Sequence, residues 1–207
     1  MAEEYITRNW AYPVSFRLDL KAARGENCEH EKRRFLSMLS GLGKRPKCVI
    51  TDSQAMDVMS RWCPEDIDLT TFSIVMINYM SNGRLSRFVQ GISALDTIKA
   101  GDFILISEAC NHSRIGEDIG TVQIPAIIER KFPGVNIEHN FGREFQDNRS
   151  LEKYSLIIHC GGCMISRQKM TARIRDLDAL GIPYTNYGIF LSAVNGPEAL
   201  KRVIRPW

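Results

Sequence analysis

Short apolar runs alternate along this chain with longer segments whose apolar positions repeat at helical spacing. Runs such as Phe103-Ile-Leu-Ile and Leu156-Ile-Ile are continuously apolar, which is typical of strands buried on both faces of a sheet. The pattern predicts strands at 48–51, 72–79, 103–107, 154–159 and 183–188, and helices near 30–40, 54–62, 84–99, 123–132, 164–180 and 197–204. This alternation predicts an α/β fold with a mostly parallel sheet and helices on both faces.

The beginning of the chain follows this pattern less clearly. Val14-Ser-Phe-Arg-Leu-Asp-Leu20 alternates between apolar and polar positions, as a half-buried strand does. The turn-forming residues at Pro64-Glu-Asp interrupt the alternation of strands and helices. We therefore expect two parts: a small, abbreviated α/β segment over residues 1–66, and a main domain over residues 67–207.

Composition and charge exclude several classes of function. Hydrophobic residues make up 44% of the chain and charged residues 25%, which is ordinary for a soluble globular protein. The net charge is +3 and no dense basic run occurs, so we expect no nucleic-acid binding. The N-terminal residues lack the apolar core of a secretion signal, and the longest apolar run is much shorter than the roughly 20 residues that span a bilayer. We expect a cytoplasmic protein without a membrane segment.

Three of the six cysteines lie in two short motifs that follow predicted strands. The motifs are Cys110-Asn-His112 and His159-Cys-Gly-Gly-Cys163. In open α/β sheets, ligands bind beyond the carboxyl ends of the strands, so neighbouring strands would bring the two motifs together. Cysteines in a reducing compartment are typically thiols or metal ligands rather than disulfides. The remaining cysteines, at positions 28, 48 and 63, have no such partners and are expected to pack as small apolar side chains.

The motif spacing favours an iron–sulfur cluster. Thiolates are the preferred ligands of such clusters, and a C-x-x-C pair places two sulfurs on one metal centre. Gly161 and Gly162 lack a Cβ atom, so the backbone can approach the cluster closely. Cys163 is expected in the first turn of the helix predicted at 164–180, where the helix dipole favours a thiolate.

Three cysteines would leave one iron of a four-iron cluster without a cysteine ligand. That iron would take His112, His159, water or an incoming molecule. Two alternatives remain open on spacing alone: cysteine and histidine sets of four bind zinc, and a C-x-x-C pair also occurs as a redox dithiol. No P-loop, G-x-S-x-G, H-E-x-x-H or G-x-G-x-x-G motif occurs, so the sequence indicates no catalytic machinery.

Several stretches resemble the HydF family, the GTPase scaffold that matures [FeFe]-hydrogenases. The resemblance runs from about Arg45 to the C-terminus. It rests on Val49-Ile-Thr-Asp-Ser-Gln-Ala55, Pro64-Glu-Asp-Ile67, Leu69-Thr-Thr-Phe-Ser-Ile74, Glu108-Ala-Cys-Asn-His112, Asp118-Ile-Gly120, Ile157-Ile-His-Cys-Gly-Gly-Cys-Met164 and Thr185-Asn-Tyr-Gly188. The H-C-G-G-C-M run at this distance from C-x-H favours a cluster over zinc.

The resemblance implies a [4Fe-4S] cluster on Cys110, Cys160 and Cys163, with His112 and His159 as accompanying histidines. It also implies a transient di-iron precursor that carries CO, cyanide and a dithiolate. Radical-SAM maturases would build this precursor, and the scaffold would deliver it to apo-[FeFe]-hydrogenase. A homodimer or larger assembly is expected. GTPase motifs of the family are absent from these residues, so we expect a scaffold rather than an enzyme, with a separate GTPase as a candidate partner.

An anionic precursor beside an anionic cluster requires nearby positive charge or hydrogen-bond donors. Arg167, close after Cys163, and Asn186, at the end of the last predicted strand, are the candidates for binding the precursor; Arg114 and Lys169 lie nearby in sequence. Two other functions remain as alternatives. One is an electron-transfer or redox-sensing iron–sulfur protein, and the other is a zinc-stabilised interaction module.

Overall fold

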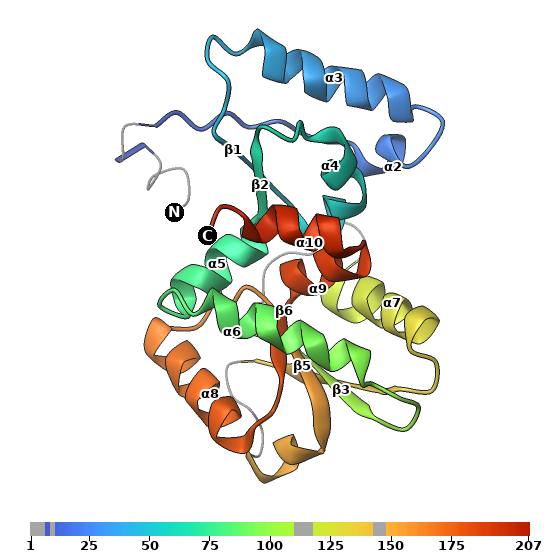
Figure 1. The fold of residues 1–207 in the computed structure, drawn as a ribbon, viewed down its shortest axis with the longest axis vertical. Coiled ribbons are helices and arrows are strands. Elements are labelled where there is room, and N and C mark those ends of the chain that lie inside the picture. Colours follow the sequence, from blue (N-terminus) through green and yellow to red (C-terminus); the bar gives the residue numbers. More distant parts are fainter. Residues whose placement is uncertain (1–6, 9–10, 110–117, 143–147) are drawn as a thin grey trace. The chain divides into compact units, whose positions relative to one another are not determined.

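The computed structural model describes residues 7–8, 11–109, 118–142 and 148–207 (Figure 1). The chain forms two compact units, residues 1–47 and 48–207. The first contains α2 (Leu20–Ala23) and α3 (Cys28–Gly41). The second contains, in order, β1 (Cys48–Thr51), η1 (Ser53–Ala55), α4 (Met56–Trp62), β2 (Asp68–Thr71), α5 (Phe72–Met80), α6 (Leu85–Gln90), η2 (Gly91–Asp96), β3 (Phe103–Glu108), η3 (Ile119–Gln123), α7 (Ile124–Lys131), β4 (Asn136–Phe141), η4 (Asn148–Lys153), β5 (Tyr154–His159), α8 (Arg167–Leu180), β6 (Tyr184–Asn186), α9 (Tyr187–Val194) and α10 (Pro197–Ile204).

The N-terminal unit is organised around the buried face of α3. Phe35 and Leu39 lie on this face, and the Phe35 ring meets Phe16 edge to face at 5.8 Å. The buried Glu31 carboxylate accepts the backbone N–H of Asp19 at 2.9 Å. The alternating stretch 14–20 forms no strand, and α2 begins at its last residue because the Asp19 side chain caps that helix.

The main unit is built on a four-stranded parallel sheet in the order β4-β3-β5-β6. The chain leaves β3 through η3 and α7 and returns as β4 on one side. It leaves β5 through α8 and returns as β6 on the other side. The two central strands, β3 and β5, therefore lie next to each other while their crossovers run in opposite directions. Such a point, where the strand order reverses, is where open α/β sheets bind ligands.

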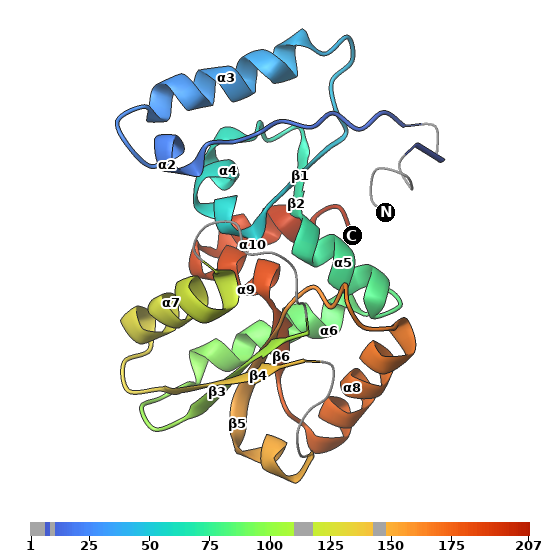
Figure 2. The same cartoon turned by 180° about the vertical axis from the view of Figure 1, so that it is seen from behind.

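Helices cover both faces of this sheet, which confirms the predicted class (Figures 1 and 2). Tyr184 and His159 point to one face, where Tyr184 meets Phe88 of α6 at 4.9 Å and His159 contacts α8. Glu108 points to the opposite face, because side chains alternate along a strand. There it lies beside η3 and the first residue of α9: a Cβ atom on Gly120 would come within 2.9 Å of Glu108 Oε2.

The last helix, α10, packs against α9, α4 and the strand β2 of the small parallel sheet β1-β2. Arg202 of α10 donates to four backbone carbonyls at the end of α4 and in the turn that follows it, and its shortest bonds, to Cys63 and Pro64, are 2.8 Å. Thr70 of β2 donates its hydroxyl to the carbonyl of Val203 at 3.1 Å. These contacts tie the C-terminal end of the chain to residues 60–71.

The clearest wrong prediction is the strand at 72–79, which is the helix α5. The run is apolar throughout, so its period does not separate strand from helix. Thr71 caps the helix by accepting the Ile74 N–H at 3.2 Å, and the strand of this region is instead β2, directly before it. The sequence also missed the edge strand β4, which is largely exposed, and α9, which begins at Tyr187 within the predicted strand 183–188. Among the described residues, every helix falls short of the length and apolar character that a bilayer-spanning segment needs.

Candidate metal centre

The His159–Cys163 motif begins at the carboxyl end of the central strand β5. The pairing of β3 and β5 continues one residue beyond β5, because the Cys160 N–H donates to the Ser107 carbonyl at 3.0 Å. Cys160 is 4% exposed, whereas Cys163 lies on the surface. The two cysteines therefore sit on the path out of the sheet, one buried against the strand ends and one open to solvent.

The end of β3 lies against Cys160. The Ala109 N–H donates to Cys160 Sγ at 3.2 Å, across 51 positions of sequence. Cys110 follows Ala109 directly in the chain. Cys110, His112 and Arg114 themselves lie outside the described residues. The described part of the chain thus brings Ala109, the residue before Cys110, to Cys160 at neighbouring strand ends, where the crossovers diverge.

The two glycines between the cysteines lie where different neighbours leave little room for a side chain. Gly162 adopts φ +70°, a left-handed conformation that favours glycine, and a Cβ atom there would lie 2.5 Å from Met170 Cε. In this conformation its N–H points to Cys160 Sγ at 3.4 Å. A Cβ atom on Gly161 would lie 3.3 Å from Met76 Cβ of α5. The loop is therefore wedged between α5 and α8, and a larger residue at either position would move it.

Helix α8 starts later than the sequence predicts. Its N-cap is Ser166, whose hydroxyl accepts the Lys169 N–H at 3.2 Å, so the helix runs from Arg167 and not from 164. Cys163 consequently lies three residues before the cap rather than in the first turn. Because the helix-dipole effect is confined to the first turn, its influence on Cys163 is weaker than expected.

His159 is enclosed between α8 and its own backbone. Its Nδ1 lies 2.7 Å from the Cys160 carbonyl oxygen, and its Nε2 lies 2.7 Å from a guanidinium nitrogen of Arg173. Burial, and then the nearby positive charge of Arg173, lower the pKa of His159 from 6.5 to about 4. The imidazole is therefore neutral at neutral pH, with both ring nitrogens engaged.

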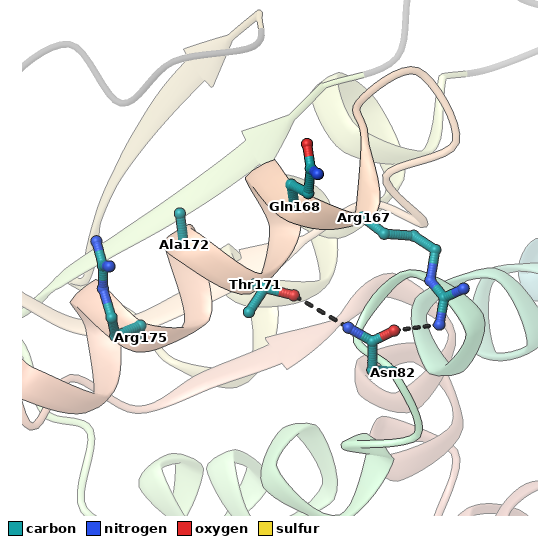
Figure 3. A pocket seen from close by; sticks show the side chains of 6 residues that line it. All are labelled: Asn82, Arg167, Gln168, Thr171, Ala172 and Arg175. Atoms are coloured by element: carbon teal, nitrogen blue, oxygen red, sulfur yellow. Dashed lines mark hydrogen bonds between the residues drawn. The ribbon is translucent and has the colours of Figure 1, made fainter.

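The two residues expected to bind a precursor have other contacts in this structure. Arg167 stacks on the Tyr79 ring at 4.8 Å. It also donates to Asn82, which in turn donates to Thr171 at 3.2 Å (Figure 3). Arg167, Asn82 and Thr171 line a surface pocket along α8. Asn186 is fully buried and caps α9 by accepting the Gly188 N–H at 2.9 Å.

Within the described ranges, no group of three or more Cys, His, Asp or Glu side chains is arranged to hold a metal ion; Cys110 and His112 are not among them. Of the cysteines outside the motifs, Cys63 is buried as expected, whereas Cys28 and Cys48 are half-buried. Burial raises the pKa of Cys48 to about 11 and raises that of Cys63, so both thiols stay protonated at neutral pH.

Arg173 is the site residue that the sequence reasoning missed. Its guanidinium also donates to the Gly142 carbonyl at 3.2 Å, so one side chain joins the ends of β4 and β5. Arg173 is 4% exposed and lies on the same helix face as Met170, Ile174 and Leu177. The sequence does contain a signal for this role: Arg173 is a charged residue among apolar positions at helical spacing, and a buried charge needs a specific partner.

The fold and the site define a class of protein: a doubly wound α/β domain with a pair of cysteines where its strand order reverses. Comparison with family models then specifies the family. Residues 86–206 match the hydrogen maturase F tetramerization domain, and residues 18–80 match the hydrogen maturase F dimerization domain. Because the first match alone covers more than half of the chain, the protein belongs to the hydrogen maturase F family, as its sequence motifs indicated. No curated protein matched the chain.

Both matched models describe self-association domains, and neither describes a catalytic domain. This finding supports self-association of the chain and a place in hydrogenase maturation. The boundary between the two models, at 80–86, falls inside the compact unit 48–207. Helix α10, which lies in the residues that match the tetramerization domain, contacts β2, which lies in the residues that match the dimerization domain, through Val203 and Thr70.

Proposed function

We propose that this protein is a non-catalytic iron–sulfur scaffold and carrier in the maturation of [FeFe]-hydrogenases. It binds a [4Fe-4S] cluster through Cys110, Cys160 and Cys163. The iron without a cysteine ligand exchanges its ligand and holds a di-iron precursor, which bears CO, cyanide and a dithiolate, for transfer to apo-hydrogenase. Membership of the hydrogen maturase F family supports the pathway, and the cysteine motifs support the cluster.

One observation carries the proposal: the contact between Ala109 and Cys160. It brings Ala109, which directly precedes Cys110, to Cys160 across 51 positions of sequence, at the ends of adjacent parallel strands. A chance pair of cysteine motifs would have no reason to converge at the ligand-binding edge of a sheet.

The environment of Cys160 fits an anionic iron–sulfur centre. Its sulfur accepts backbone N–H groups from Ala109 and Gly162, and hydrogen bonds to sulfur are one of the means by which proteins stabilise such clusters. Burial lowers the pKa of Arg173, and the negative charge of a Cys160 thiolate opposes this shift and favours the charged guanidinium in the same region. When bound, the cluster supplies an iron with an exchangeable ligand position; the chain supplies thiolates, N–H donors and a cation.

The partners follow from this role. We propose that radical-SAM maturases deliver the precursor, that apo-[FeFe]-hydrogenase accepts it, and that a separate GTPase supplies nucleotide-dependent control. The reducing cytoplasm is the proposed compartment, since exposed thiols such as Cys163 remain reduced there.

Arg167 and Asn186 are proposed to contact the anionic precursor. Asn186 is fully buried and would first have to leave Ser73, the His159 carbonyl and the Gly188 N–H. The Arg167 side chain would first leave Asn82 and Tyr79. Arg167→Ala should therefore keep its cluster but bind a synthetic di-iron mimic about tenfold more weakly, equivalent to about 1.4 kcal/mol. Equal capture by this variant and the wild type, at matched iron content, would remove Arg167 from the proposal.

The cluster assignment is tested by anaerobic reconstitution followed by assay of iron and inorganic sulfide per chain. Cys110→Ala, Cys160→Ala and Cys163→Ala should each lose most of the iron, whereas Cys48→Ala should bind as much as the wild type. Cys48 is a matched control because it is a half-buried thiol outside the motifs. Full occupancy in Cys160→Ala would overturn the assignment, and zinc without sulfide would indicate a zinc-stabilised module.

A further inference from the structure

Arg173 occupies an unusual position for an arginine. It lies on the buried face of α8, 4% exposed, and reaches across to the ends of two strands. One guanidinium nitrogen contacts His159 Nε2 at 2.7 Å, and another donates to the Gly142 carbonyl at 3.2 Å. Burying a guanidinium costs several kcal/mol unless its N–H groups are satisfied, so these contacts fix its orientation.

The contact with Arg173 determines the tautomer of His159. A guanidinium has donors and no acceptor, so His159 Nε2 must accept the hydrogen bond. The ring proton then resides on Nδ1, which donates to the Cys160 carbonyl at 2.7 Å. In this arrangement neither ring nitrogen has a lone pair directed at a metal.

The same chain of contacts reaches the sulfur. Holding the Cys160 carbonyl fixes the peptide plane between Cys160 and Gly161. The following residue, Gly162, donates its N–H to Cys160 Sγ. The orientation of the loop around the sulfur therefore depends on an imidazole that Arg173 holds in place.

We propose that Arg173 is a positioning residue of the metal centre: it locks His159 onto the Cys160 backbone, and His159 makes no bond to iron. This inference rests on the proposed cluster function. It assigns the two residues of the H-C motif separate tasks, with Cys160 as the ligand and His159 as the link between that ligand and α8.

The positioning role is tested with Arg173→Gln, Arg173→Lys and the control Arg175→Gln. Arg175 lies on the same helix with a side chain that is 75% exposed, so its variant carries the same change of charge without the buried contacts. Release of iron to a chelator should be about 10- to 100-fold faster in Arg173→Gln, a loss typical when the partner of a metal-binding group is removed. Arg173→Lys should fall between, since lysine keeps the charge but not the forked donor geometry. Arg175→Gln should match the wild type.

The role of His159 is tested by pulsed EPR of the reduced cluster in protein grown with isotopically labelled histidine. The histidine nitrogen coupling, or its absence, should be the same in the wild type and in His159→Gln, because glutamine retains an acceptor for Arg173 and a donor for the Cys160 carbonyl. Loss of a directly coupled nitrogen signal in His159→Gln would show that His159 is an iron ligand and would overturn the inference.

The outcomes separate this inference from the proposed function. If Cys160→Ala loses iron while both Arg173 variants release it at the wild-type rate, the scaffold proposal stands and the positioning role is wrong. If Cys160→Ala keeps its iron, the proposed function itself fails. If Arg173→Gln does not fold, the Lys variant still tests positioning, and the spectrum of His159→Gln still tests ligation.

Discussion

Replacing Gly162 with alanine isolates what the backbone of the cysteine loop contributes. Gly162 has φ +70°, and a Cβ atom there would lie 2.5 Å from Met170 Cε. Gly181, at the end of α8, has nearly the same φ, +66°, but a Cβ atom there would meet nothing within 4 Å. Gly181→Ala is therefore a control with the same backbone strain and no clash.

The expected magnitudes follow from these two differences. A left-handed alanine costs about 1–2 kcal/mol, and both variants carry that cost. Gly162→Ala must also displace Met170, and overpacking costs about 1–3 kcal/mol. Since the clashing atom is the end of a flexible side chain, the lower end applies, and Gly162→Ala should be less stable than Gly181→Ala by about 1 kcal/mol.

Urea unfolding of the cluster-free proteins measures this difference as a change in midpoint at constant slope. Iron content after anaerobic reconstitution provides a second readout. Only Gly162→Ala should bind less iron, because only its N–H is directed at Cys160 Sγ. Equal stability and equal iron content in the two variants would show that the space beside Met170 does not restrict residue 162, and would refute this reasoning.

Three further predictions concern the rest of the molecule. Arg202→Ala should lower the free energy of unfolding, measured by urea titration, by about 2–3 kcal/mol, because four backbone carbonyls lose a charged donor. The control Arg175→Ala should differ from the wild type by less than about 0.5 kcal/mol. The Asp19 N–H, and also Arg34, hold the pKa of Glu31 below its ordinary value of 4.5. The stability that these contacts confer is present above pH 4.5 and is lost as the pH falls through the lowered pKa. Glu31→Gln should therefore make the free energy of unfolding, measured by urea titration, less dependent on pH in the acidic range. Light scattering should give at least twice the 23.5 kDa chain mass, because β1 pairs only with β2 in the described residues and both matched domains are self-association domains; a monomer at micromolar concentration would contradict this.

The sequence predicted the parts of the fold that have a strong local signal. The apolar runs at 103–107 and 154–159 are the central strands, and their buried, continuous pattern reflects cover on both faces. The rule that ligands bind at strand ends predicted that the two cysteine motifs meet if their strands are neighbours. The two strands do pair, and Ala109, which precedes Cys110, contacts Cys160. These features follow from residue type and spacing alone.

Other features depend on contacts between distant residues and were not predictable in this way. The apolar run at 72–79 fits a helix or a strand equally well, and the cap at Thr71 decides between them. The strand β4 lies at the edge of the sheet and is largely exposed, so its sequence is partly polar and lacks the continuous apolar run of the central strands. The role of Arg173 appears only when α8 is placed over His159, since nothing near Arg173 in sequence marks its partner.

The proposed carrier function requires a cluster with one iron whose ligand can be exchanged. The most direct test is the EPR spectrum of the reduced, reconstituted protein before and after addition of isotopically labelled cyanide. A changed spectrum with a coupling to the labelled carbon is expected, since a cluster held by three cysteines leaves one iron open to the added ligand. An unchanged spectrum without such coupling, from a protein with full iron and sulfide, would show a closed cluster suited to electron transfer and would contradict the scaffold role.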